Sequence, residues 1–314
     1  MGLELSIVIP TYNEEGNIEF LYSELKGVLL VLGRSHEIIF IDDGSKDGTL
    51  AVLKKIREQD NNIKIIKFRK NFGQSAALKA GFDYASGNII ISMDADLQND
   101  PKDIPLILKK MESEDYDVVC GWRYNRQDSS SKKIFSKIAN KLRRWLTQEK
   151  IHDSGCTLRS YKNECVKNLD LYGELHRYIP AILQWKGYRI SEIQVIHKER
   201  FSGTSKYSWK RIFNGFLDLM IILFWQKYSV RPMHFFGGIG LIFIFFGFVI
   251  DCVLVFERLF YNMGLTDRPL FLVGLILVVI GFQFIALGII ADILLKIYYG
   301  QNERKNYLVD RESK

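Results

Sequence analysis

Asp94 and Asp96 are the side chains of this sequence whose type and spacing are best suited to chemistry. They follow residues 87–91, a short apolar run that is typical of a buried parallel strand. We therefore expect them at the carboxyl end of a strand, where open α/β sheets bind their ligands. Two carboxylates in such a turn can converge on one hard divalent cation, and Gln98 could add a neutral oxygen. The pattern predicts a metal site with room for a diphosphate.

A second Asp-x-Asp sequence, Asp115 and Asp117, stands at the expected start of another strand. The same spacing can arise without a metal, and we interpret this second pair as a solvated strand cap. The first pair differs from it by following a strand and by the motifs that lie upstream.

The elements that must position the first pair alternate between strands and helices. This alternation predicts an α/β domain with a doubly wound, mostly parallel sheet. The expected strands are 5–10, 37–41, 63–68, 87–91 and 117–120, and the helices between them end near residues 31, 59 and 85, with a further helix after Pro101.

A polar cluster follows each expected strand. Any one cluster could simply cap a helix, as Asp42 and Asp43 before Gly44 would do. Helix capping alone does not explain five polar clusters at one edge of one sheet, so we expect this edge to be the binding site. The clusters are Thr11, Tyr12 and Glu14, then Asp42 and Asp43, then Arg69 and Asn71, then Asp94 and Asp96, and finally Arg123.

The composition divides the chain into a polar front and an apolar back. The 314 residues are 47% hydrophobic with a mean hydropathy of −0.02, and the apolar excess lies after residue 212. The formal net charge of +7 favours anionic partners such as nucleotides or phospholipid headgroups. No arginine-rich low-complexity segment indicates nucleic acid, and the four cysteines lack metal-binding spacing, which fits a reduced, cytosolic domain.

The apolar back predicts membrane association. Aromatic and aliphatic residues recur at helical spacing over 206–227, which indicates an amphipathic juxtamembrane helix lying on the membrane. Two runs near 235–256 and 270–295 are each long enough to span a bilayer. The basic residues that flank them place both tails in the cytoplasm. The expected organisation is a catalytic domain over 1–205, an interfacial region over 206–231, a transmembrane hairpin over 232–297 and a cytoplasmic tail over 298–314.

The motifs VIPTYNE at 8–14, DDGS at 42–45 and DAD at 94–96 resemble those of GT-A glycosyltransferases of family 2. Within that family the chain resembles the polyprenyl-phosphate glycosyltransferases, which include dolichol-phosphate mannose synthases and bactoprenol glucosyltransferases. The resemblance extends over essentially the whole chain, including the apolar tail. It implies a GT-A domain on the cytoplasmic side of the inner (plasma) membrane.

The resemblance also implies a nucleotide-sugar site. Asp94, Asp96 and Gln98 would hold Mg²⁺ or Mn²⁺ against the diphosphate of the donor, because the cation neutralises the departing nucleoside diphosphate. The residues implied to bind the nucleotide are Pro10, Tyr12, Glu14, Ile41, Asp43, Ala95 and Gln98.

Further residues are candidates for the transfer step. Asp153 is a candidate base or sugar contact, although a turn aspartate before a strand explains it equally well. His176 and Arg177 belong to the segment 174–180, which resembles a conserved box of the family. Arg200 and Lys206, in the basic loop 197–207, would bind phosphate, and a juxtamembrane linker attracted to anionic lipid is the alternative. The implied catalytic set is Asp94, Asp96, Arg123, Asp153, His176, Arg177, Arg200 and Lys206.

The resemblance therefore implies inverting transfer of a hexose, by our assignment glucose from UDP-glucose, to polyprenyl phosphate at the cytoplasmic membrane face. GDP-mannose is the main rival donor. A processive polysaccharide synthase is disfavoured because residues 141–145 read KLRRW and lack the glutamine of the Gln-x-x-Arg-Trp motif. A non-catalytic membrane scaffold is disfavoured by the intact Asp94, Asp96 and Arg200. The transmembrane helices could also support homo-oligomers.

Overall fold

The computed structural model describes residues 3–124, 151–167, 169–198, 231–261 and 268–301, together with Phe224, Tyr228 and Gly264. The chain forms two compact units, Met1–Leu219 and Met220–Lys314, and each is described by itself. The interfacial region predicted over 206–231 lies almost entirely outside the described residues.

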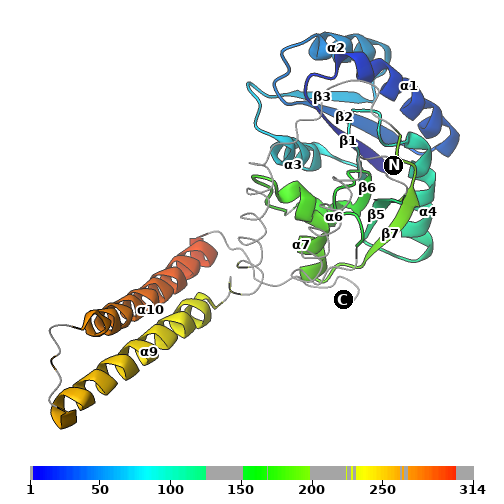
Figure 1. Cartoon of the computed structure of the whole chain (residues 1–314). Coiled ribbons are helices and arrows are strands. Elements are labelled where there is room, and N and C mark those ends of the chain that lie inside the picture. Colours follow the sequence, from blue (N-terminus) through cyan, green and yellow to red (C-terminus); the bar gives the residue numbers. More distant parts are fainter. Residues whose placement is uncertain are drawn as a thin grey trace. The chain divides into compact units, whose positions relative to one another are not determined.

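The first unit is built on a sheet of seven strands in the order β3-β2-β1-β4-β6-β5-β7 (Figure 1). Six of them run parallel, and β6 alone runs antiparallel to its neighbours β4 and β5. The predicted mostly parallel sheet is therefore confirmed. The strands are β1 (Leu5–Thr11), β2 (His36–Asp42), β3 (Ile63–Lys67), β4 (Ile89–Ser92), β5 (Val118–Arg123), β6 (Arg159–Lys162) and β7 (Ile190–Val195).

Helices cover both faces of this sheet (Figure 1). One face carries α1 (Glu15–Leu32), α2 (Thr49–Gln59) and α4 (Ile104–Ser113), the last preceded by the short helix η1 (Pro101–Asp103). The other face carries α3 (Gln74–Tyr84), α6 (Asn163–Lys167) and α7 (Ile179–Trp185), with the short helix η2 (Leu175–Tyr178) beside α3. Burial on both faces explains why the central strands β1, β2 and β4 are largely apolar.

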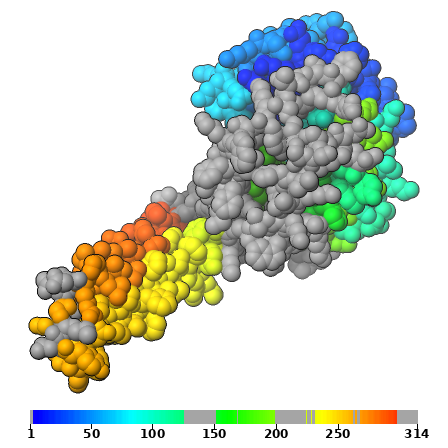
Figure 2. Space-filling model, in the orientation of Figure 1, coloured from blue at the N-terminus to red at the C-terminus, as the bar shows by residue number. Residues whose placement is uncertain are grey.

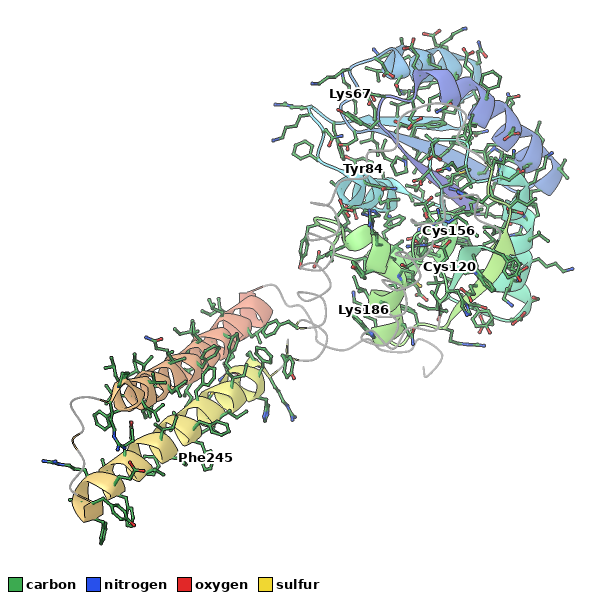
Figure 3. The ribbon with its side chains drawn as sticks, viewed as in Figure 1. Lys67, Tyr84, Cys120, Cys156, Lys186 and Phe245 are labelled. Carbon is green, nitrogen blue, oxygen red and sulfur yellow. The ribbon has the colours of Figure 1, made fainter. Side chains whose placement is uncertain are left out.

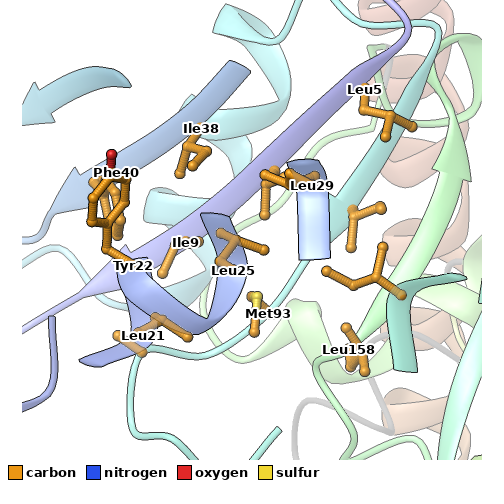
Figure 4. Close-up of a cluster of buried hydrophobic side chains, with 14 of the residues drawn as sticks. Leu5, Ile9, Leu21, Tyr22, Leu25, Leu29, Ile38, Phe40, Met93 and Leu158 are labelled. Carbon is orange, nitrogen blue, oxygen red and sulfur yellow. The ribbon is translucent and has the colours of Figure 1, made fainter. Parts of the chain in front are cut away.

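The main core lies between the sheet and α1 (Figure 4). Leu21, Leu25 and Leu29 recur at four-residue spacing and form one buried stripe of α1. They pack over alternate residues of β1, such as Leu5 and Ile9, which are fully buried. Each such side chain stabilises the fold by about 1.5–3 kcal/mol relative to an exposed one. The core therefore gives the site a rigid sheet edge.

On the opposite face, α3 approaches β1 closely at Gly81. A Cβ atom at this glycine would lie 2.2 Å from Cγ1 of Val8 and 3.0 Å from Cδ1 of Ile41. Any larger residue would push the helix away from the sheet. The absence of a side chain at Gly81 thus lets the start of α3 reach the edge at which β1 and β4 end.

The second Asp-x-Asp pair is structural. Asp115 is exposed, and its carboxylate lies 3.0 Å from Nζ of Lys162 and 3.2 Å from the guanidinium of Arg189. Asp117 binds the same ammonium at 2.9 Å. These surface ion pairs join the starts of β5 and β7 to the end of β6, away from the carboxyl ends of the parallel strands.

The second unit is a helical hairpin of α9 (Pro232–Tyr261) and α10 (Pro269–Gln301). Both are long and apolar enough to cross a membrane, since an 18-residue stretch within Pro232–Tyr261 and another within Pro269–Ile297 each have a mean hydropathy of 2.8. The helices lie against each other along their length (Figure 2). Exposed apolar side chains such as Phe245 project away from the partner helix (Figure 3). The hairpin agrees with the two predicted spans.

Small residues let these two helices approach. Cβ atoms at Gly240 and Gly247 of α9 would lie 2.6 and 2.5 Å from the carbonyl oxygens of Gly281 and Gly274. Asp251 packs directly on Gly274, whose added Cβ would lie 2.1 Å from the Asp251 carboxylate. Asp292 instead pairs with Lys296 one turn later. A role of Asp251 in helix packing agrees with these contacts.

Candidate active site

A cavity of about 280 Å³ opens at the carboxyl ends of β1, β2 and β4. Its position matches the predicted edge of the sheet. Two of the nucleotide-binding residues expected from the sequence, Ile41 and Gln98, do not line this cavity. Ile41 is fully buried beside α3. The lining residues are Pro10, Thr11, Tyr12, Glu14, Asp43, Asn71, Gly73, Gln74, Ala77, Asp94, Ala95 and Asp96.

The loops that frame this cavity are tied to one another. Asn13 adopts a left-handed conformation (φ 57°), which asparagine tolerates better than most residues. Its amide donates to Oγ of Ser45 at 3.0 Å, and its side-chain oxygen accepts from the amide of Lys46 at 2.8 Å. Gly44 (φ 72°) allows a still closer approach, because a Cβ atom there would lie 2.5 Å from the backbone of Lys70. The three loops after β1, β2 and β3 are thereby held together.

Asp43 joins the end of β2 to the start of α3. Its two carboxylate oxygens accept hydrogen bonds from the amides of Phe72 at 2.7 Å and Gly73 at 2.9 Å. Burial raises the pKa of Asp43, and these two amide donors oppose that effect. The carboxylate therefore orders one wall of the cavity, and lone pairs remain for a donor group of a ligand.

Asp94 and Asp96 both line the cavity, from the turn that follows β4. Leu97 holds this turn in a left-handed conformation (φ 61°), which is costly for a residue with a branched side chain. Gln74, the first residue of α3, donates from Nε2 to Oδ1 of Asp94 at 2.8 Å. Asp94 also has a hydrogen bond with the side chain of Thr157, so two neighbours fix the position of its carboxylate.

The charge of Asp96 disfavours ionisation of Asp94. Burial raises the pKa of Asp94 to about 6, and the charges of Asp96 and Glu14 act in the same direction. Thr157 and Arg123 oppose this shift without cancelling it. Such a pair is stabilised by a cation that neutralises both oxygens.

The donor set fits a hard divalent cation. Mg²⁺ and Mn²⁺ prefer carboxylate, phosphate and water oxygens, and Mg²⁺ sites commonly use only one or two protein carboxylates. In the described part of the chain no three His, Cys, Asp or Glu side chains form a metal-binding group. Asp94 and Asp96 would therefore supply two ligands, with a diphosphate and water completing the shell.

The raised pKa of Asp94 predicts how metal binding depends on pH. The folded, metal-free protein holds this proton more tightly than the unfolded chain, since the pKa moves from 3.8 to about 6. The group therefore reduces stability as pH rises through this range, and a cation that requires the ionised form restores it. Calorimetric titration should show Mn²⁺ binding about tenfold more weakly at pH 5 than at pH 7. Equal affinity at both values would remove Asp94 from the ligand set.

Arg123 and Asp153 form an ion pair beside this site. Nε and an Nη atom of Arg123 contact the two oxygens of Asp153 at 2.6 and 2.9 Å, a bidentate geometry. Burial disfavours the charged guanidinium, but the hydrogen bonds and charge of Asp153 outweigh it and hold the pKa of Arg123 above its ordinary value. Gly155 packs on the guanidinium, because a Cβ atom there would lie 2.8 Å from it. The carboxylate of Asp153 thus orients Arg123.

His176 is buried in η2 and attached to α3. Its Nδ1 lies 2.9 Å from Oγ of Ser75, and its backbone amide donates to the same oxygen at 3.1 Å. Arg177 is partly exposed and pairs with Glu174 at 3.1 Å. Neither residue is among those that line the cavity, but Ser75 directly follows Gln74, which does.

The segment after the two aspartates is fastened to the end of β7. The amide of Lys198 donates to the carbonyl oxygen of Gln98 at 3.0 Å, and Nε2 of Gln98 lies 3.5 Å from Nε2 of His197. Nζ of Lys198 lies 3.1 Å from Asp100. Arg200 and Lys206 are outside the described residues.

Sequence reasoning did not assign Gln74, although it contacts Asp94. A signal was present, because Gln74 stands at the start of the helix that follows β3, at the same sheet edge as the other clusters. Thr157 and Arg159 were also missed. They lie at the start of a strand that the sequence did not predict to reverse direction, and no local pattern marked them.

A model of glycosyl transferase family 2 matches residues 6–169, which is more than half of the chain and includes the whole cavity wall. The chain belongs to glycosyl transferase family 2. The family domain thus carries Asp94, Asp96, Arg123 and Asp153, whereas η2 and the helical hairpin lie beyond the matched region.

Relatives of nearly full length support this assignment. The chain is 38% identical over 312 residues to a dodecaprenyl-phosphate galacturonate synthase of Rhizobium johnstonii, covering 98% of this chain and 92% of that one. It is 34% identical over 310 residues to an undecaprenyl-phosphate 4-deoxy-4-formamido-L-arabinose transferase of Klebsiella pneumoniae, covering 98% and 93%. The similarity includes the helical hairpin as well as the catalytic unit.

Solved structures show the same fold. The chain is similar in fold to glucosyl-3-phosphoglycerate synthase from Mycobacterium tuberculosis, solved with Mn²⁺, UDP-glucose and phosphoglyceric acid. The TM-score is 0.54 at 16% sequence identity, over 71% of this chain and 79% of that one. This likeness confirms the predicted GT-A architecture.

Proposed function

We propose that this protein transfers a sugar from a nucleoside diphosphate to a polyprenyl phosphate. The observation that carries the proposal is the Asp94–Asp96 pair on the cavity of a family 2 domain, in a chain that also has two helices able to span a membrane. A lipid-linked acceptor must be met at the bilayer surface, and the hairpin would keep the enzyme there. The two relatives named above carry polyprenyl phosphates in their names and support this acceptor class.

The donor would occupy the cavity with its nucleoside toward the loops after β1 and β2. Pro10, Tyr12, Glu14 and Asp43 line that part and would contact the base and ribose. Asp94 and Asp96, with Gln98 beside them, would hold Mg²⁺ or Mn²⁺ against the diphosphate. When bound, this cation would neutralise negative charge on the departing nucleoside diphosphate.

The acceptor needs orientation more than activation. A phosphate monoester has a second pKa near 6, so it is already largely a dianion at pH 7. A strong base is therefore not required, and we assign Asp153 the role of orienting Arg123. Arg123 would hold a phosphate near Asp94 against the repulsion of the donor diphosphate. A single displacement by this oxygen would invert the anomeric carbon.

Arg200 and Lys206 would supply further positive charge. Lys198 is fixed beside Gln98, and two residues of chain span at most about 7 Å, so the chain reaches Arg200 from a point next to the metal segment. His176 and Arg177 lie on η2, which is fastened to the helix that carries Gln74. We assign the two cations to phosphate binding and the η2 residues to the sugar side of the site.

Replacing Arg200 by lysine should lower the transfer rate about tenfold or more, although the charge is kept. A guanidinium grips a phosphate with two parallel hydrogen bonds, whereas an ammonium cannot. Calorimetry should show nearly unchanged binding of the nucleoside diphosphate with Mn²⁺, because the contact is assigned to the acceptor. Parallel losses of nucleotide affinity and rate would move Arg200 to the donor, and no change in either would make its loop a lipid-facing linker.

The sugar and the nucleotide are tested by a donor panel. Purified protein in bilayers with Mn²⁺ and undecaprenyl phosphate would be given UDP-glucose, UDP-galacturonate and GDP-mannose, each with a labelled sugar. We propose a uridine nucleotide with a hexose, UDP-glucose first, and the galacturonate synthase relative justifies the second donor. Label in the lipid phase from any of these donors supports the transfer function. Its absence with every donor tried, including pentose donors, would contradict it.

The proposed topology places the catalytic domain and both tails in the cytoplasm. Basic residues lie at the ends of the hairpin opposite its turn, including Arg231 before α9 and Lys296 near the end of α10. At the turn between the helices, Arg268 pairs with Glu257, so the charges there are balanced. This asymmetry follows the preference of short basic flanks for the cytoplasmic side. The domain boundaries at 205, 231 and 297 remain part of this proposal.

A further inference from the structure

Arg159 is a buried cation at the sheet edge that carries the site. Arg159 is the first residue of β6 and is only 3% exposed. Because β6 runs antiparallel to its neighbours, this first residue is paired with Ser92 at the end of β4 and with Cys120 of β5. The reversed strand therefore brings Arg159 to the carboxyl ends of the parallel strands.

The guanidinium of Arg159 bridges two separate segments. One Nη donates to the carbonyl oxygen of His176 at 3.1 Å, and the other donates to that of Ser154 at 2.5 Å. Among the described residues its Nε has no hydrogen-bond partner, and no carboxylate lies within ion-pair distance. A buried charge is usually retained with a counter-ion. Here the planar fork instead fixes the separation of two backbone carbonyls.

Both of these segments lead to the site. Ser154 directly follows Asp153, whose carboxylate holds Arg123 in the bidentate pair. This is the first branch, and it connects Arg159 to a cation that acts electrostatically on Asp94.

The second branch runs through η2 and α3. His176 contacts Oγ of Ser75 through both its ring and its amide, and the neighbouring Gln74 donates to Asp94 at 2.8 Å. Arg159 therefore closes a ring of contacts that starts at Asp94 and returns to it through Arg123.

We propose that Arg159 is a positioning residue that holds Arg123 and His176 at a fixed separation across the active site. The inference rests on the proposed transfer function and assigns no contact between Arg159 and a substrate. Arg159 acts through its hydrogen bonds to the carbonyl oxygens of Ser154 and His176. The nucleoside wall formed by the loops after β1 and β2 lies outside this ring, so the ring should govern turnover rather than nucleotide affinity.

The test is Arg159→Lys in the full-length protein. Lysine keeps the charge, but one ammonium cannot reproduce the planar fork that reaches both carbonyls. We expect kcat for sugar transfer to fall about tenfold or more. The dissociation constant of UDP with Mn²⁺ should change less than about twofold, because Arg159 donates to the carbonyls of Ser154 and His176 and not to Asp94 or to the loops that line the nucleoside part of the cavity.

Arg189→Lys is the matched control. Arg189 also donates to a backbone carbonyl, that of Glu114 at 3.1 Å, and it pairs with Asp115, but it stands before β7 at the other end of the sheet. Its replacement should leave both kcat and nucleotide affinity within about twofold of wild type. A generic cost of shortening an arginine would instead appear in both variants.

Ser75→Ala removes a different contact of the same ring, the one between Ser75 and His176. It provides a second test in case Arg159→Lys does not fold. It should lower kcat with unchanged UDP affinity, and the double variant should lose less than the product of the two single losses. If the wild-type enzyme transfers sugar and both single variants match its kcat, the positioning role is wrong while the transfer function stands. A parallel loss of melting temperature, UDP affinity and kcat would make Arg159 an ordinary core residue. A wild-type protein without transfer would overturn both proposals.

Discussion

Replacing Asp96 by asparagine is expected to reduce sugar transfer by about a thousandfold or more without unfolding the protein. Of the four carboxylates that line the cavity, only Asp94 and Asp96 are assigned to the metal, so neutralising one should remove most of the metal affinity. The loss should appear both in the rate of label transfer to lipid and in Mn²⁺ binding by calorimetry. The fold should survive, because Asp96 is only partly buried and relief of the Asp94–Asp96 repulsion favours the folded state.

The chain carries its own control for this experiment. Asp115→Asn makes the same chemical change in the second Asp-x-Asp pair, where Asp115 binds Lys162 and Arg189 at the surface. Because exposed ion pairs contribute about 0–1 kcal/mol, this variant should keep its activity and nearly all of its stability. Near wild-type turnover of Asp96→Asn, or full activity of the wild-type enzyme in EDTA, would refute the metal site.

Asp153→Asn is expected to damage both stability and catalysis. The change leaves the guanidinium of Arg123 buried without its carboxylate, and breaking a buried ion pair in this way costs about 3–5 kcal/mol. Arg123 would also lose the bidentate contact that orients it near Asp94. We expect a clearly lower melting temperature by circular dichroism in detergent and a loss of transfer of about a hundredfold.

Glu112→Gln serves as the control for that variant. Glu112 also binds an arginine, Arg34, through both oxygens, but both side chains are partly exposed on the surface of the domain. Its replacement should cost no more than about 1 kcal/mol and leave transfer unchanged. If Asp153→Asn melts like wild type and keeps full activity, the pair does not organise the site. If it melts like wild type but is inactive, Asp153 acts on the substrate directly.

The sheet and the hairpin could be predicted because each follows from a local pattern. Apolar runs such as 87–91 alternate with helical segments, and this alternation alone indicates a parallel sheet whose strands end at one edge. The cavity accordingly includes Tyr12, Asp43 and Asp94, each from a different strand end. The hairpin follows from the length of two apolar segments.

The contacts between elements could not be predicted in the same way. The role of Asp153 depends on Arg123, which is 30 residues earlier in the chain. The sequence alone therefore could not distinguish a catalytic base or sugar contact from a turn aspartate at this position. Ile41 stands next to Asp42, but the alternation of a strand turns its side chain toward α3 instead of the cavity.

Arg159 shows why strand direction matters for such reasoning. Parallel strands place the residues that follow them at the active edge of the sheet. In β6 the direction is reversed, so the residue at the active edge is the first one of the strand. Only the pairing of β6 with β4 and β5 reveals this, and that pairing is a tertiary property.

The most direct test of the central claim is the identity of the two products. Wild-type protein in bilayers with Mn²⁺, a nucleotide-sugar donor that it accepts and undecaprenyl phosphate should form a lipid that carries one phosphate between sugar and polyprenyl chain. It should release one nucleoside diphosphate for each sugar transferred, and mass spectrometry with nucleotide chromatography would measure both. EDTA and Asp96→Asn should abolish both products together. Release of a nucleoside monophosphate with a diphosphate-linked lipid, or transfer that continues without a divalent cation, would contradict the mechanism proposed for this enzyme.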